Sequence, residues 1–545
     1  MSAMSHEGRA GADPFGPFPL LADLVALAPT NLEDPAHRRE EKHHYQETAD
    51  FLLATARRLG LPARLWDARE GLEGGRDRFS SARPNVIVEL NLSAPRTLLV
   101  LAHFDVVPVP EEQRERWLSP PHTLTARENG RWYGRGSNDD LGSGVVASLR
   151  ALHHLSQRGS LPVGVRLLLS PDEETGGAGG IEALVAHDQA LPVGSPERFL
   201  LGEAAFLPDG SPYVAAGSSG VCFLDVDRDR PGPFAQFVAL ARRVETFHQV
   251  AQEWRSSLPT PDFPGGGGRS PTIPGRATVT RMELAGARRP GSLPSLVTAR
   301  AESEAANQIA GAVTLQFAGS PEALEALGRS LKEGAREPFS VRELTGGKEG
   351  ELRTQIVGRA GHGGYPHRAA NPVSEALRLL ESALMAGLVD GSSVAEGTFT
   401  VDLRSPPEME VGPSLERFRS FFEPLRSAYP GARFVAPADR QRAGYSLSPD
   451  HPVVVRVQRT YEAVTGHPVG IFGEYGGTDA SALRRLKTPS GEPLPAVVFG
   501  SMDEEAHIHD AEESVDPRRL AEVEELLFRL VSEWPSQRPG ARPEG

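Results

Sequence analysis

Short apolar runs and longer amphipathic segments alternate along the first part of the chain. The amphipathic segments have the residue spacing of helices and lie at 37–60, 145–154 and 181–187. The apolar runs have the length of buried strands and lie at 86–88, 97–102, 165–169 and 198–201. This strand–helix–strand rhythm predicts an α/β fold with a doubly wound, mostly parallel sheet.

The pattern changes after Ser219. Residues 228–350 hold a glycine run and scattered prolines, which predict an insertion that is partly loop. A strand at 351–357, a helix at 372–385 and a strand at 397–404 then predict a small α+β unit. The α/β pattern returns with helices at 415–429, 452–465 and 517–534 and strands at 469–472 and 496–499. We therefore expect one large domain that is interrupted by a second, smaller one.

Charge and cysteine content exclude several classes of protein. The formal net charge is −14, which disfavours nucleic acid and anionic lipid surfaces as partners. The single cysteine, Cys222, excludes an intrachain disulfide and cysteine-based metal centres, and its apolar neighbours favour a buried strand residue over a nucleophile. Residues 1–16 lack the apolar core of a signal peptide, and no apolar run reaches about 18 residues. We therefore expect a cytoplasmic protein without a membrane partner.

Histidines and carboxylates follow the predicted strands, at the sheet edge where α/β proteins gather reactive groups. Five of them are candidate metal ligands: His103, Asp139, Glu174, Glu203 and His509. Imidazole and carboxylate without thiolate suit zinc, with cobalt or manganese as substitutes. Five ligands exceed the needs of one open tetrahedral site, so we expect two ions with Asp139 as the bridge. Glu173 is then the natural general base, and Asp105 can orient the ring of His103.

Together these segments resemble the M20 family of co-catalytic zinc peptidases and amidases. The resemblance rests on residues 103–108, 134–139, 171–174, 202–203, 476–480 and 509–515. Residues 361–372 are similar to a segment of succinyl-diaminopimelate desuccinylases, and acetylornithine deacetylases, aminoacylases and glutamate carboxypeptidases belong to the same group. His509 is preferred to His507 as the ligand because it places residues 512–515 in the family's register.

The resemblance implies a role for each matching residue. His103 and Glu203 would bind one zinc ion and Glu174 and His509 the other, with Asp139 bridging. His362 would reach across a homodimer interface to the reacting oxyanion. Arg404 and Asn371 would hold a substrate carboxylate, and the turn at Gly477 and Thr478 would line the substrate pocket.

The expected activity is hydrolysis of an amide or peptide bond next to a free carboxylate. A metal-bound hydroxide would attack the carbonyl, with Glu173 as general base. Glu203 favours N-acyl amino acids or carboxypeptidase substrates, because relatives with aspartate at that position belong to the aminopeptidase and dipeptidase branch. An M20-type dipeptidase or aminopeptidase is the alternative, and a catalytically silent binding scaffold is the alternative from another class.

The same resemblance sets the expected domain limits. Residues 14–216 and 409–545 would form the di-zinc catalytic domain. Residues 217–408 would form a lid and dimerisation domain that includes the insertion, and residues 1–13 would be a disordered tail.

Overall fold

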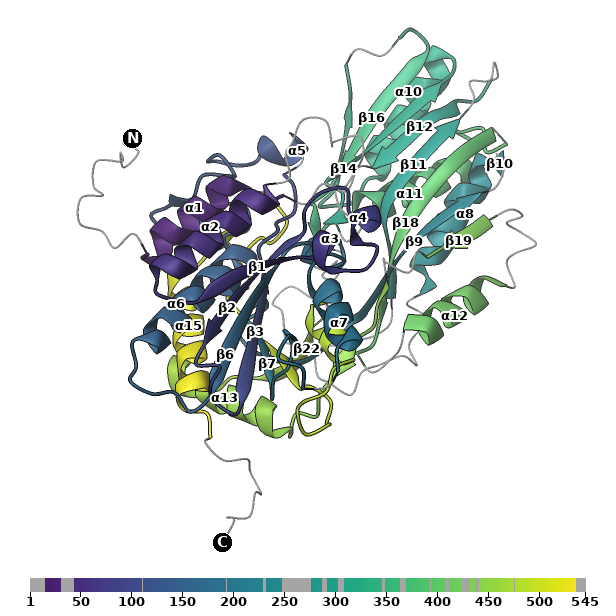
Figure 1. The fold of residues 1–545 in the computed structure, drawn as a ribbon. Helices are drawn as coiled ribbons and strands as arrows, with labels where there is room; N and C mark the ends of the chain where they lie inside the picture. The colour runs from purple at the N-terminus through teal and green to yellow at the C-terminus, as the bar shows by residue number, and fades with distance from the viewer. Residues whose placement is uncertain are drawn as a thin grey trace.

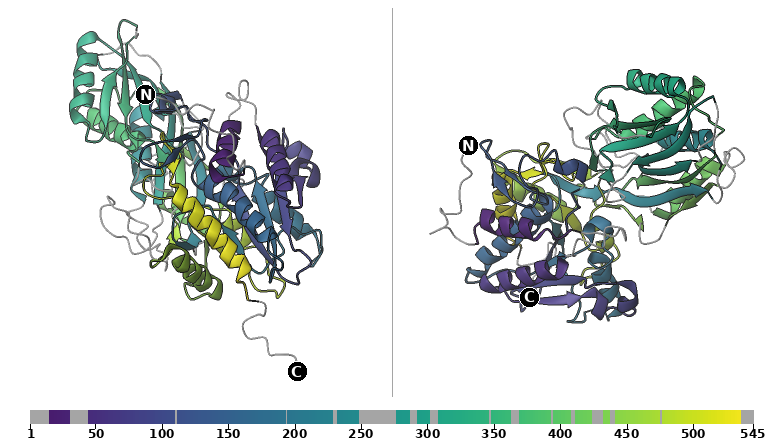
Figure 2. Two further views of the ribbon diagram at one scale, coloured as in Figure 1. Left: turned by 90° about the vertical axis from the view of Figure 1, so that its left-hand side faces the viewer. Right: turned by 90° about the horizontal axis from the view of Figure 1, so that it is seen from above.

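The computed structural model contains two large β-sheets, and Figures 1 and 2 show them in two separate lobes. The structure describes residues 15–30, 44–109, 111–192, 194–228, 232–247, 276–286, 292–301, 308–345, 348–362, 369–392, 394–407, 411–423, 432–436, 441–474 and 476–535. The predicted tail at 1–13 lies outside the described residues. No described helix is long and apolar enough to cross a membrane.

The first sheet is built from both ends of the chain, in the strand order β1-β2-β6-β3-β7-β23-β8-β21, with β22 beside β8. Its members are β1 (Ala63–Asp67), β2 (Pro84–Leu90), β3 (Thr97–His103), β6 (Gly164–Ser170), β7 (Ala205–Leu207), β8 (Val214–Ser218), β21 (Tyr445–Ser446), β22 (Ile471–Glu474) and β23 (Ala496–Val498). β3 runs parallel to β6 and β7, whereas β1 and β2 add antiparallel pairs at one edge. The parallel centre brings the carboxyl ends of β3, β6 and β7 to one side of the sheet.

Amphipathic helices cover this sheet with leucine and valine side chains that are buried in one continuous core. The longer helices are α1 (Pro17–Leu27), α2 (Tyr45–Arg58), α6 (Ser148–Ser156), α7 (Ile181–Ala190), α13 (Pro452–Thr465) and α15 (Pro517–Ser532). Short elements connect them: α3 (Ala68–Gly71), α4 (Gly75–Arg78), α5 (Glu111–Arg114), the π-helix η2 (Asp139–Ala147), the 3₁₀ turn η3 (Glu173–Thr175), α14 (Ala480–Leu483) and a small sheet of β4 (Thr125–Ala126), β5 (Trp132–Tyr133) and β24 (Ser514–Val515).

The second sheet is antiparallel, in the order β15-β16-β14-β12-β11-β18-β9-β19. Its strands are β9 (Gly220–Arg228), β10 (Gly232–Pro233), β11 (Arg276–Gly286), β12 (Ser295–Ala301), β14 (Ala312–Ala318), β15 (Ser340–Glu343), β16 (Glu351–Val357), β18 (Val394–Ser405), β19 (Ala432–Val435) and β20 (Gln441–Arg442). β13 (Gln308–Ile309) pairs separately with β17 (Gly361–His362). Helices α8 (Phe234–Glu245), α10 (Pro321–Gly334), α11 (Pro372–Met385) and α12 (Val411–Phe422) accompany the sheet, and the lobe has its own apolar core.

The structure corrects two predictions about this second domain. Residues 228–350 were predicted as a partly looped insertion within the domain, but their described parts include β11, β12 and β14, which are central strands of its sheet. The domain also does not end at 408. Leu415 and Phe418 of α12 are buried in its core, and β19 and β20 pair with β9. The chain therefore returns to the first domain between Arg442 and Tyr445.

Candidate metal centre and active site

His103 is the last residue of β3, and its ring contacts Asp105, two positions later in the chain. Nδ1 of His103 lies 3.0 Å from the backbone oxygen of Asp105 and 3.3 Å from the Oδ1 atom of that residue. Both side chains are buried. Because Nδ1 is engaged there, Nε2 is the nitrogen that is left to bind another group.

Two carboxylates face Nε2 of His103. Asp140 Oδ1 lies 3.6 Å away and Asp209 Oδ1 lies 3.5 Å away, and one ligand atom from each of the three residues fits within a 4.8 Å span. Burial lowers the pKa of His103, but Asp209, Asp105 and Asp140 outweigh it, so the net shift is well above the usual value. An imidazole and two carboxylates that converge here, two of them buried and Asp209 half-buried, form a donor set for a divalent cation such as zinc.

This trio differs from the predicted ligands in two ways. Asp140 and Asp209 were not predicted, and Asp139 begins η2 directly before Asp140. The side chain of Asp139 lies outside the described residues, so its bridging role stays a prediction. The sequence holds a local signal for Asp209, the apolar triplet 205–207 before a Pro-Asp-Gly turn, but residues 199–201 before Glu203 are also an apolar triplet.

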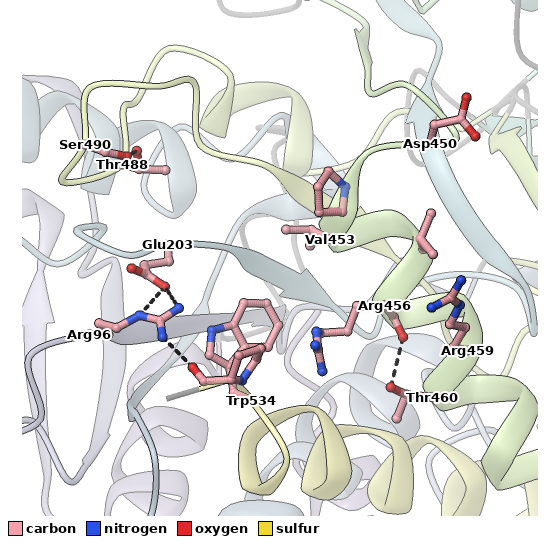
Figure 3. Close-up of a pocket in the computed structure, with 13 residues that line it drawn as sticks. Arg96, Glu203, Asp450, Val453, Arg456, Arg459, Thr460, Thr488, Ser490 and Trp534 are labelled. Carbon is pink, nitrogen blue, oxygen red and sulfur yellow. Dashed lines mark hydrogen bonds and ion pairs between the residues drawn. The ribbon is translucent and has the colours of Figure 1, made fainter. Parts of the chain in front are cut away.

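Glu203 lies elsewhere, and its predicted role as a ligand of the His103 site is not what the structure shows. Its backbone N–H donates to Thr97 at the start of β3, the opposite end of that strand from His103. Figure 3 shows its carboxylate paired with Arg96, whose Nε lies 2.7 Å from Oε2, in a groove of about 620 Å³ that Trp534 also lines. The prediction failed because residues 198–201 form no strand, whereas β7 begins at Ala205.

Glu173 and Glu174 lie on a tight turn that follows β6. Asp172 adopts a left-handed conformation with φ of 69°, and its carboxylate is held by Arg83 Nε at 2.7 Å. The turn directs two successive backbone N–H groups at Asp105, which accepts from Glu173 at 2.9 Å and from Glu174 at 3.1 Å. Asp105 therefore ties the turn to the ring of His103.

His509 provides the second histidine of the site. Its Nε2 lies 2.8 Å from Glu174 Oε1, and its side chain is buried, whereas His507 is exposed. Burial lowers the pKa of His509, but Glu174 outweighs it, so the net shift is upward. The structure thus brings His509 and not His507 to the predicted partner Glu174.

The loop that carries His509 is anchored by the segment around Arg135. Arg135 is fully buried and donates to Glu513 at 2.6 Å and to Gln113 at 2.8 Å, while Gln113 donates to the backbone oxygen of His509 at 3.1 Å. Arg131 pairs with Asp503 through both terminal nitrogens. The glycine–arginine–glycine segment at 134–136 therefore holds the last motif in place.

Arg442 contacts Glu173, and it was not among the residues predicted from the sequence. Its Nη1 donates to Glu173 Oε1 at 2.6 Å, its Nη2 donates to the backbone oxygen of Glu173 at 3.0 Å, and Nη2 lies 3.5 Å from Asp479. Burial raises the pKa of Glu173, and Arg442 and His103 oppose that rise without cancelling it. Burial also raises the pKa of Asp479 well above its usual value.

The residues predicted to bind substrate lie in two places. Arg404 is buried on β18 and donates to Asp402 through Nε at 2.6 Å and Nη2 at 2.8 Å. A side chain added at Gly477 would lie 3.9 Å from Nη1 of Arg404 and 2.8 Å from Val221, so the turn at Gly477 and Thr478 lies against this strand. Thr478 is buried and accepts the N–H of Ala480 at 3.0 Å.

Asn371 lies directly before α11, and His362 lies on β17. Asn371 caps α11 by accepting the N–H of Val373, and its amide donates to the backbone oxygen of Val279 at 2.9 Å. This capping role accounts for both ends of its side chain. His362 lies on β17, and its side chain lies outside the described residues.

Comparison with known proteins places these features in context. The model of the peptidase family M20/M25/M40 matches residues 99–533. Among individual proteins, the Cys-Gly metallodipeptidase dug1 of Schizosaccharomyces pombe is 27% identical over 188 residues, which are 34% of this chain and 38% of that protein. The Beta-Ala-His dipeptidase of Rattus norvegicus is 28% identical over 214 residues, 38% of this chain and 41% of that protein. These matches span less than two thirds of either relative.

Solved structures resemble the whole chain. The dipeptidase Dug1p of Saccharomyces cerevisiae has a TM-score of 0.54 at 13% identity and covers 95% of this chain and 96% of its own. The metallo-carboxypeptidase Sso-CP2 of Sulfolobus solfataricus has a TM-score of 0.52 at 16% identity and covers 94% of this chain and 98% of its own. At these identities the likeness establishes the fold, with its larger domain and its interrupting domain.

Proposed function

Because the chain belongs to the peptidase family M20/M25/M40, we propose that it is a divalent-metal-dependent hydrolase of dipeptides. The observation that carries the proposal is the convergence of His103, Asp140 and Asp209 within 4.8 Å, beside the turn of Glu173 and Glu174. A buried group of this composition without a thiolate fits zinc, cobalt or manganese. When bound, such an ion polarises the scissile carbonyl and lowers the pKa of a water molecule.

We propose two ions for each chain. The Nε2 atoms of His103 and His509 face different carboxylates, Asp140 and Asp209 for the first and Glu174 for the second. The two groups are linked through Asp105, which contacts His103 and accepts the N–H of Glu174. Asp139, directly before Asp140, is the proposed bridge between them.

Glu173 is the proposed general base. It is adjacent in sequence to the ligand Glu174, and its carboxylate lies in a buried place where its pKa is raised above the usual value, first by burial. A carboxylate with a raised pKa is a stronger base than a free carboxylate, which favours its use in proton transfer. Glu173 would remove a proton from the attacking water and deliver it to the leaving amine.

Dipeptides are preferred as substrates for two reasons. Four of the relatives with detectable sequence similarity are named as dipeptidases. The argument for N-acyl amino acids rested on Glu203 as a ligand, and Asp209 faces His103 in its place. In this proposal the free carboxylate of the substrate would bind near Arg404, whose Nη1 faces the turn at Gly477.

Hydrolysis of N-acyl amino acids is the second candidate. The observation in its favour is a match to the N-fatty-acyl-amino acid synthase/hydrolase PM20D1 of Mus musculus, which is 39% identical over 113 residues and covers 21% of each chain. Both substrate classes end in a free carboxylate, so they differ at the amine end, where dipeptides carry a free ammonium group and N-acyl amino acids carry an acyl chain.

The test is a substrate panel with zinc-loaded and metal-free protein. Dipeptides are compared with N-acetyl and N-fatty-acyl forms of the same amino acids, and release of the free amino acid is measured. Turnover of dipeptides only when metal is present supports the proposal. Exclusive turnover of the acylated forms would replace it with the second candidate, and turnover of neither by protein that retains metal would contradict both.

A further inference from the structure

The backbone of Arg442 is part of the second domain, whereas its side chain contacts Glu173 of the first domain. It lies on β20, where it pairs with Val221 of β9 in the second sheet. Three residues later, Tyr445 pairs with Ser218 of β8 in the first sheet. The residue therefore occupies the last position of the second domain before the chain crosses back.

The side chain of Arg442 holds one residue at two points. Nη1 donates to the carboxylate of Glu173 at 2.6 Å, and Nη2 donates to the backbone oxygen of the same residue at 3.0 Å. Only 12% of the Arg442 side chain and 13% of the Glu173 side chain is exposed. A planar guanidinium that binds the main chain and the side chain of one residue restricts the rotation of that side chain, which a single-point cation does not.

The backbone is closely packed where the chain passes from Arg442 in the second domain to Tyr445 in the first. A Cβ atom at Gly444 would lie 2.6 Å from the backbone oxygen of Pro407 and 2.9 Å from the backbone nitrogen of Gly220. The two glycines therefore bring both crossings of the chain into backbone contact. This close packing restricts the backbone two residues after Arg442, whose guanidinium is held by its two contacts with Glu173.

We propose that Arg442 is a positioning residue for the general base, and that it makes the orientation of the Glu173 carboxylate depend on the seating of the second domain. The inference rests on the proposed function, because it takes Glu173 as the base. Arg442 touches neither water nor substrate in this account. It acts by holding the carboxylate of Glu173 and the backbone below it in one orientation.

The alternative is that Arg442 only neutralises the nearby carboxylates of Glu173 and Asp479. A lysine would supply the same charge at a single point, so Arg442→Lys separates the two accounts. Arg442→Ala removes both the charge and the fork, and leaves space in which an added guanidinium ion can bind. Arg485→Ala is the control, because Nη2 of the exposed Arg485 donates to Glu182 at 2.5 Å and not to Glu173.

The experiment compares zinc-loaded variants by metal content, thermal unfolding, kcat and KM on a dipeptide. Positioning predicts metal content and KM close to wild type in both Arg442 variants, with kcat lowered about tenfold in Arg442→Lys and about 100-fold in Arg442→Ala. Guanidinium chloride at low, non-denaturing concentration should raise the kcat of Arg442→Ala and leave Arg485→Ala unchanged. Wild-type kcat in Arg442→Lys, or loss of bound metal in that variant, would overturn the proposal.

A second measurement does not depend on catalysis. Unfolding free energies of metal-free wild type, Glu173→Gln, Arg442→Lys and the double variant form a double-mutant cycle. The inference predicts that the two changes are not additive, because each removes the same fork contact. If the wild-type chain hydrolyses no substrate of the panel, the proposed function fails, but the cycle still measures whether Arg442 and Glu173 interact. Additive free energies would overturn the role of Arg442.

Discussion

The Oδ1 atom of Asp105 accepts the backbone N–H group of Glu173 at 2.9 Å. The second oxygen of Asp105 accepts the N–H of Glu174 at 3.1 Å, and Oδ1 also lies 3.3 Å from Nδ1 of His103. One fully buried carboxylate thus contacts both the proposed metal ligand His103 and the turn that carries the proposed base. The loss of one of its acceptor oxygens should disturb both.

Asp105→Asn should lower activity about 10- to 100-fold together with metal affinity, because an amide nitrogen cannot accept the second N–H group. The measurements are kcat and the zinc dissociation constant. Asp188→Asn is the matched control, since buried Asp188 also accepts two successive backbone N–H groups, from Phe199 and Leu200. The control should lose stability but keep zinc affinity, and equal zinc affinities in Asp105→Asn and wild type would contradict the assignment.

Asp209 and Glu203 give opposite predictions for metal binding. Asp209→Asn should release metal from the proposed His103 site because it removes a carboxylate charge that faces Nε2. Glu203→Gln should retain wild-type metal content and lose stability through the broken pair with Arg96. Zinc per chain after dialysis against metal-free buffer distinguishes the two variants. Loss of metal in Glu203→Gln with retention in Asp209→Asn would restore the ligand set predicted from the sequence.

His122 should make stability sensitive to mild acid. Burial lowers its pKa from 6.5 to about 4, with Arg135, Arg114 and His44 adding to the effect. The unfolded chain therefore binds more protons than the folded chain between these two values, so the stability from neutral His122 is complete above pH 6.5 and is lost as pH falls toward 4. The full loss is at most about 3 kcal/mol.

His122→Gln should reduce this acid dependence. Unfolding free energies of metal-free wild type and variant are measured by urea titration at several pH values across the window, and the difference between them should shrink as the pH falls. A constant difference across the window would show that His122 does not titrate between folded and unfolded states as described.

Local signals in the sequence were sufficient for many elements. The helices at 372–385 and 452–465 were predicted with the limits that α11 and α13 have in the structure. Each begins with a proline whose preceding residue, Asn371 or His451, caps the first turn, and these signals lie within the segment itself. The strand at 351–357 was likewise predicted with the limits of β16 because its side chains alternate between buried and half-buried.

The pairing of strands that are distant in the chain could not be predicted from the sequence. Residues 199–201 and 205–207 are both apolar triplets followed by an acidic residue, and only the pairing of Ala205 and Phe206 with β3 selects the second. That choice decides whether Glu203 or Asp209 meets His103. Arg442 could not be connected with Glu173 either, because 269 positions separate them and no local pattern marks an arginine that reaches another domain.

The most direct test of the account is the activity of Glu173→Gln beside wild type, with zinc content measured in the same samples. The substitution keeps the shape of the side chain and removes its ability to accept a proton. If Glu173 is the general base, the variant should keep equal zinc content and its kcat on dipeptides should fall about 10³-fold, within the range for loss of a general base. A kcat within a few fold of wild type at equal zinc content would contradict the role of Glu173 and the mechanism built on it.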